Sequence, residues 1–158
     1  MEEGNSEAVV RELQLVRAGT LQFGIFADEI ATIVAWREPS PLPHAPKPVL
    51  GVVGIQGRVL TVLEFTTLAL RNASTTEPSM DNERRIIALR GDEQLALAVD
   101  GVGEIIKIAG RDLKPKQALV DALVLVVWQV EDAEISILNV RQLFTSAIQG
   151  RERRRRRF

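Results

Sequence analysis

Short aliphatic runs, each closed by a tight turn, constrain the fold of this chain more than any other feature. Four pairs of runs flank a turn of two or three residues. The pairs are 13–18 with 21–26, 49–55 with 58–63, 85–90 with 94–99, and 122–130 with 134–138. The two shortest turns, Gly19-Thr20 and Gln56-Gly57, contain the glycine typical of tight β-hairpins. This punctuation favours an all-β barrel or sandwich.

Segments between the hairpins have other signatures. Five prolines between Arg37 and Pro48 exclude a helix interior or a central strand there, and predict an ordered loop or extended arm. The polar segment 71–83 is the best linker candidate. Ile30, Ile33 and Val34 predict a short helical turn leading into a strand that ends near Trp36.

Two helices are also expected in the second half. Spacing of the aliphatic residues predicts a short helix around 102–108. A second helix over 139–149 would close the fold, with Asn139 as its N-cap.

The two halves of the chain repeat one another. A shift of 72 pairs Phe23 with Leu95 and Asp28 with Asp100, and a shift of 75 pairs Val62 with Ile137. Both shifts cross the linker. We therefore expect two small β subdomains that share an apolar core.

Composition excludes several classes of chemistry. The chain has no cysteine, so disulfides, thiolate nucleophiles and iron-sulfur clusters are ruled out. Its one histidine, His44, lies in the proline-rich segment with no acidic residue nearby in sequence. Adjacent carboxylates such as Asp28-Glu29 fall in predicted turns, where solvated acidic residues are common. We expect no enzymatic activity, cofactor or metal.

Charge is divided unevenly along the chain. Six of the 20 basic residues and one of the 21 acidic residues lie in the final RERRRRRF, which leaves residues 1–150 with 14 basic and 20 acidic residues, a net charge of −6. Such a body has no general affinity for nucleic acid. The tail, 148–158, admits two interpretations: a disordered solubilising end, or an anchor for anionic lipid or nucleic acid. The acidic start and the absence of a long apolar run favour a soluble, cytoplasmic protein.

Two segments resemble the CheW-like domain family of chemotaxis coupling proteins. The more specific is LALAVDGVGEIIKI, residues 95–108, followed by Leu113-Lys114-Pro115. The other runs from Ala45-Pro46 through the strand at Gly51-Val52 to the turn Ile55-Gln56-Gly57. The likeness extends over 13–147 and leaves 1–12 as a disordered N-terminal segment.

The resemblance implies two SH3-like, five-stranded β-barrels around a shared core, with a C-terminal helix. It implies a scaffold that couples the cytoplasmic tips of chemoreceptors to the regulatory domain of a CheA-type histidine kinase, in arrays at the inner face of the membrane. Other CheW-like domains are further candidate partners. The positions that match the family's partner-binding surfaces are Val34, Trp36, Ile55, Gln56, Gly57, Val99, Asp100 and Val102.

Departures from the family pattern affect the choice of partner. Gln56 stands where the family usually has arginine, and it offers neither charge nor a bidentate fork. Gly54, Thr61 and Glu64 also differ, replacing asparagine, proline and aspartate. A diverged module with other protein partners, or with membrane contact through its arginine tail, is the alternative function.

Overall fold

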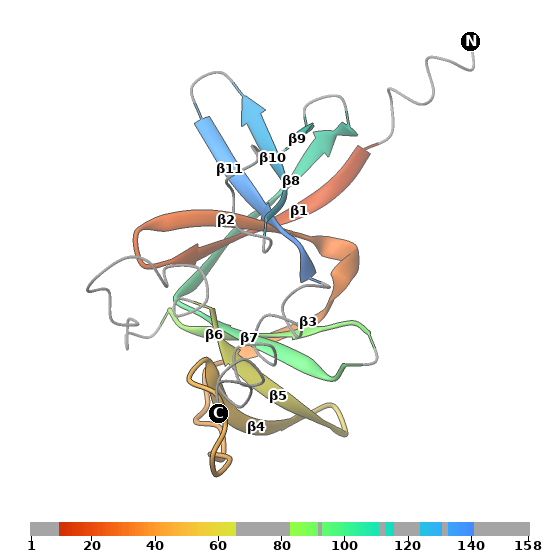
Figure 1. Ribbon diagram of the computed structural model, residues 1–158. Helices are drawn as coiled ribbons and strands as arrows, with labels where there is room; N and C mark the ends of the chain where they lie inside the picture. Colours follow the sequence, from red (N-terminus) through yellow and green to blue (C-terminus); the bar gives the residue numbers. More distant parts are fainter. Residues whose placement is uncertain are drawn as a thin grey trace.

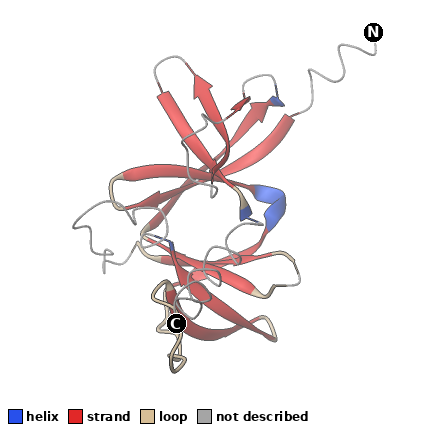
Figure 2. Cartoon of the chain, viewed as in Figure 1, coloured by secondary structure: helices blue, strands red, loops and turns tan. Residues whose placement is uncertain are grey.

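The described strands form two β-sheets, one above the other in Figure 1. The computed structural model describes residues 10–65, 83–91, 93–110, 113–115, 124–130 and 133–140. Within these ranges the strands are β1 (Val10–Ala18), β2 (Leu21–Phe26), β3 (Ile30–Ala35), β4 (Val49–Ile55), β5 (Arg58–Glu64), β6 (Arg85–Leu89), β7 (Leu95–Val99), β8 (Gly101–Ala109), β9 (Leu113–Pro115), β10 (Val124–Val130) and β11 (Ala133–Leu138). One 3-10 turn, η1 (Ala27–Glu29), precedes β3. The β class predicted from the sequence is confirmed (Figure 2).

All four predicted hairpins are present. Strand β1 pairs antiparallel with β2, β4 with β5, β6 with β7, and β10 with β11. Gln56 and Gly57 turn the β4–β5 hairpin with φ angles of 52° and 79°. Two consecutive left-handed residues match the twist of the flanking strands, which explains why glycine occupies the second position.

The two sheets do not divide the chain at the predicted linker. The first sheet has the order β8-β1-β2-β11-β10-β9, and the second has the order β3-β6-β7-β5-β4. Strand β3 follows β2 in sequence yet joins the second sheet beside β6, and β8 follows β7 yet joins the first sheet beside β1. Each sheet therefore contains strands from both halves. The first has six strands rather than the expected five, because the short β9 pairs with the outer edge of β10.

The internal repeat reappears in the strand register. In the first sheet Phe23 lies opposite Ser136, and in the second Leu95 lies opposite Thr61. Leu95 is 72 positions after Phe23, and Ser136 is 75 positions after Thr61. The two parallel pairings are thus equivalent, and the shifts seen in the sequence correspond to equivalent places in the two sheets.

One apolar cluster connects the two sheets. Val16, Ala18, Ile25 and Leu138 from the first sheet pack with Leu63, Ile87, Leu95, Leu97 and Val99 from the second. Phe23 of β2 meets Phe65, just after β5, with ring centroids 5.0 Å apart and an interplanar angle of 75°, an edge-to-face contact. These contacts bear out a shared core.

Two local expectations are corrected. The helix predicted around 102–108 is wrong, because this segment is the strand β8, paired along its length with β1. Gln14 pairs with Ile105 and Val16 with Val102, so β8 has one extra residue in this interval, a β-bulge. The bulge interrupts the two-residue alternation of side chains along β8, and its aliphatic residues therefore recur at a spacing like that of a helix. The helical turn lies earlier than expected, at Ala27–Glu29, and β3 begins at Ile30 itself.

The first strand starts earlier than the predicted domain. It begins at Val10, which pairs with Ala109, so residues 10–12 of the expected N-terminal segment are part of β1. Residues 71–82 of the predicted linker, 141–149 of the predicted closing helix and the whole predicted tail, 148–158, lie outside the described residues. In the part of the chain that is described, no helix has the length and apolarity to cross a bilayer.

Gly51 allows the proline-rich segment to lie against β4. Ser40 and Val52 exchange two backbone hydrogen bonds, of 2.9 Å and 2.8 Å. Gly51 has a φ of +149°, and a Cβ there would overlap the Ser40 carbonyl oxygen. We expect Gly51→Ala to lower the free energy of unfolding by about 2 kcal/mol, measured by urea denaturation.

Gly54→Ala is the matched control for Gly51→Ala in the same strand. A Cβ at Gly54 would meet only the Arg58 carbonyl oxygen, at 3.9 Å, which is an ordinary contact. Equal unfolding midpoints for the two variants would contradict the close approach at Gly51.

Candidate partner-binding surface

The second sheet carries three of the predicted partner-binding residues on one face. Val34 of β3 lies opposite Ile86 of β6, and Trp36 follows the end of β3. Both are half-buried and pack, together with Ile55, against the cluster built on Leu60, Val62 and Ile86. Ile55 itself is buried, so it shapes this surface from within rather than contacting a partner directly.

The β4–β5 turn presents the next two predicted residues to solvent. Gln56 and Gly57 are exposed at its tip, and Val59, the second residue of β5, is also exposed. Arg58 turns away from the tip and donates a hydrogen bond from Nη2 to the Gly91 carbonyl oxygen, at 3.3 Å. The tip therefore offers an amide and an apolar side chain.

The remaining three residues lie where the chain crosses from the second sheet to the first. Val99 ends β7, Asp100 is the single residue between strands, and Val102 is the second residue of β8. Val99 and Asp100 are buried, whereas Val102 is 36% exposed. Val102 is therefore the accessible member of this group.

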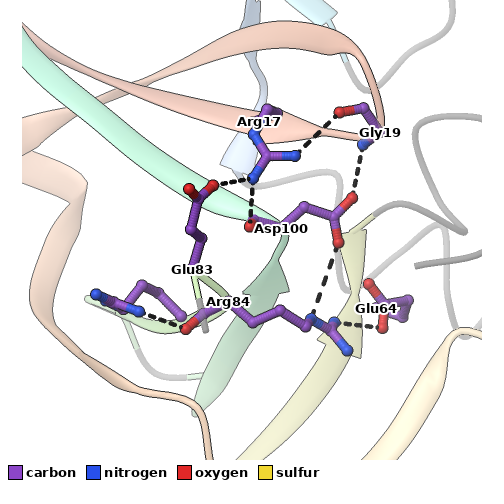
Figure 3. A network of polar contacts seen from close by, with 7 residues as sticks. Arg17, Gly19, Glu64, Glu83, Arg84 and Asp100 are labelled. Carbon is purple, nitrogen blue, oxygen red and sulfur yellow. Dashed lines mark hydrogen bonds and ion pairs between the residues drawn. The ribbon is translucent and has the colours of Figure 1, made fainter. Parts of the chain in front are cut away.

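A buried polar network, which sequence reasoning missed, joins the crossing to the second sheet (Figure 3). Arg84, only 3% exposed, places Nη2 2.7 Å from Oε1 of Glu64 at the end of β5. Its Nε lies 3.8 Å from Oδ1 of Asp100. The same guanidinium lies over the Trp36 ring, with Cζ 4.3 Å from the ring centroid.

The crossing is also tied to the first hairpin. The Gly19 backbone N–H donates to Oδ2 of Asp100 at 2.6 Å, and Nη2 of Arg17 donates to the Asp100 carbonyl oxygen at 2.9 Å. Arg17 also forms an ion pair of 2.6 Å with Glu83. Asp100 is thus a structural residue that holds the β1–β2 turn and the β7–β8 crossing together.

Two strand edges border these groups. Among the described strands, β3 pairs only with β6, and β8 pairs only with β1. Each therefore has one edge at which another β-strand could add by backbone hydrogen bonding. Strands β3 and β8 are also the strands at which the described chain crosses from one sheet to the other.

Over the described ranges, no three His, Asp or Glu side chains gather where they could hold a metal ion. The buried Arg84 lies between the carboxylates of Glu64 and Asp100, beside the crossing from the second sheet to the first (Figure 3). This arrangement is suited to fixing a surface in place.

The sequence of this chain is similar to a known domain family and to two known proteins. The model of the CheW-like domain family matches residues 12–147. "Chemotaxis protein CheW" of Rhizobium meliloti is 32% identical over 105 residues, and "Probable chemotaxis protein CheW" of Rhizobium etli is 26% identical over 106 residues. Each match covers 66% of this chain and 66% of the relative, just under two thirds of the relative's length.

A solved structure shares the fold. The scaffolding protein TtCheW of Thermoanaerobacter tengcongensis superposes with a TM-score of 0.76 at 18% sequence identity. The superposition covers 86% of this chain and 93% of that protein.

Proposed function

Because the chain belongs to the CheW-like domain family, we propose that it is a non-enzymatic adaptor in a chemotaxis or related two-component signalling array. It would couple chemoreceptors to a CheA-type histidine kinase in the cytoplasm, at receptor arrays. The observation that carries this proposal is the family match over residues 12–147. The similarity to a chemotaxis protein of Rhizobium meliloti, and the fold shared with a scaffolding protein, support the same role.

The receptor tip would contact the two strands that change sheet. Val34 and Trp36 are half-buried at the end of β3, and Val102 is exposed near the start of β8. Partly exposed aliphatic and aromatic side chains are suited to an apolar helical partner. The buried Val99 and Asp100 would support this surface from beneath.

The kinase regulatory domain would contact the β4–β5 turn. Ile55 is buried behind the turn, and Gln56 and Gly57 are exposed at its tip. Since Gln56 lacks a guanidinium, this contact would depend on apolar and backbone groups rather than on an ion pair. We expect its affinity to respond weakly to salt.

Co-sedimentation tests the proposal directly. The full chain is mixed with receptor cytoplasmic fragments and with a CheA-type kinase encoded in the same genome. Sedimentation of the chain with both is the expected result. Failure to bind every such receptor and kinase would exclude the coupling role.

A single substitution tests the receptor-facing side. We expect Val102→Lys to weaken binding of the receptor fragment at least tenfold, because it places a strongly hydrated charge in an apolar contact. Isothermal titration calorimetry measures the affinity.

Val10→Lys is the control for Val102→Lys. Val10 is also an exposed valine, and it pairs with Ala109 at the far end of β8, seven residues from Val102 or roughly 20 Å along the strand. Equal losses of affinity in both variants would show that the start of β8 is not part of the receptor-facing surface.

A further inference from the structure

Arg84 occupies an unusual position beneath the proposed partner-binding surface. Arg85 lies opposite Ala35 in the β3–β6 pairing, so the residue before it comes beside Trp36, the residue after Ala35. There the guanidinium stacks on the indole ring, at 4.3 Å from its centroid. A cation held over an aromatic face restricts the orientation of the ring.

The same guanidinium holds the other side of the surface. It contacts Glu64 at 2.7 Å and Asp100 at 3.8 Å, and all three side chains are almost completely buried. Asp100 lies two residues before Val102. Figure 3 shows Arg84 between the carboxylates of Glu64 and Asp100. Because the same guanidinium also lies over Trp36, one cation links the residue that follows β3 to the crossing that leads into β8.

The internal repeat supplies a comparison within the molecule. In the β1–β2 hairpin Leu13 pairs with Phe26, and in the β6–β7 hairpin Ile86 pairs with Ala98. Ile86 is 73 positions after Leu13 and Ala98 is 72 positions after Phe26, so the two pairs are equivalent. The same shift of 73 makes Arg84 the counterpart of Arg11. Arg11 likewise pairs with an aspartate, Asp28, at 3.0 Å, and lies over an aromatic ring, that of Phe26, at 3.5 Å. Asp28 is the counterpart of Asp100 at a shift of 72.

The two copies differ in burial. The side chains of Arg11 and Asp28 are 40% and 65% exposed, whereas those of Arg84 and Asp100 are 3% and 0% exposed. The fold therefore accommodates the pair in water at one place and encloses it at the other. Burial of charges costs desolvation, and it can give in return a unique local geometry.

We propose that Arg84 is a positioning residue for the partner-binding surface; this proposal rests on the proposed function. It fixes the Trp36 ring and the Asp100 crossing in one geometry, so that both sides are presented to the receptor together. Arg11, which makes the same kinds of contact in water, has no such role.

Lysine substitutions at the two arginines test this assignment. Lysine keeps the charge but lacks the planar fork that stacks on the ring and reaches two carboxylates. Both variants are made in a Trp128→Phe background, which leaves Trp36 as the only tryptophan. Acrylamide quenching of Trp36 fluorescence in the free protein, and the affinity for the receptor fragment, are then measured.

Arg84→Lys is expected to increase quenching of Trp36 and to weaken receptor binding about tenfold, while Arg11→Lys changes neither. The loss of affinity should disappear when Arg84→Lys is combined with Trp36→Ala, because the guanidinium acts through the ring. A purely structural role would instead give the same loss in both backgrounds.

Three results would overturn the assignment: unchanged quenching in folded Arg84→Lys, changed quenching with unchanged affinity, or equal effects at Arg11. Failure of the proposed function is recognised separately. In that case the unsubstituted chain binds neither receptor nor kinase, and the quenching of free Arg84→Lys alone decides whether Arg84 positions Trp36.

Discussion

Replacement of Arg84 by methionine is expected to lower the free energy of unfolding by about 3–5 kcal/mol. Methionine fills much of the volume of the arginine stem but removes the cation between Glu64 and Asp100, both of which are buried. Two carboxylates would then lie within the protein without the guanidinium they face. Urea denaturation followed by far-ultraviolet circular dichroism measures the change.

Arg11→Met provides the control for Arg84→Met, since it removes the equivalent arginine of the first half. Its ion pair with Asp28 is largely exposed, so we expect a loss of at most about 1 kcal/mol. Similar losses at the two arginines would mean that burial at Arg84 contributes nothing.

Leu97→Ala is expected to lower the free energy of unfolding by about 2–5 kcal/mol. Leu97 lies in the middle of β7, between β6 and β5, and is completely buried in the cluster that both sheets share. Truncation leaves a cavity at the junction, where Ile25 of the first sheet and Ile87 of the second belong to the same cluster. Urea denaturation again provides the measurement.

The shared cluster predicts how the Leu97→Ala loss is distributed. Trp36 follows β3 of the second sheet, and Trp128 lies in β10 of the first, so single-tryptophan variants report on the sheets separately. Both probes should show one transition, shifted equally by Leu97→Ala. A shift confined to the Trp36 probe would indicate sheets that unfold independently.

Hairpins were the part of the fold most accessible from sequence. Glycine at positions 19 and 57 marks turns that require a positive φ, which is a local backbone property. Such turns can be recognised from the sequence without knowledge of tertiary contacts. The strand β8 was misread because its periodicity is broken by a bulge that exists only through pairing with β1. The exchange of β3 and β8 between sheets is likewise a long-range property, with no local signature in the sequence.

The candidate site was predictable only as a set of positions. The resemblance selected Val99 and Asp100, yet these residues are buried, and the contacts that explain Asp100 come from Arg84 and Gly19. Arg84 is an ordinary charged residue in a charged stretch, and its burial depends on β6 lying between β3 and β7. A comparison of the halves at a shift of 73, which aligns Arg11 with Arg84, was the available clue.

The exchange of β3 and β8 makes the chain resemble a domain-swapped pair fused into one polypeptide. In a swapped dimer, each subunit completes the sheet of its neighbour. Here the segment up to β5 contributes β1 and β2 to the first sheet and β3, β4 and β5 to the second. The segment from β6 onward contributes β6 and β7 to the second sheet and β8 to β11 to the first. A protease that cut the backbone between β5 and β6 would therefore yield two fragments that stay interlocked through both sheets, rather than two separable domains.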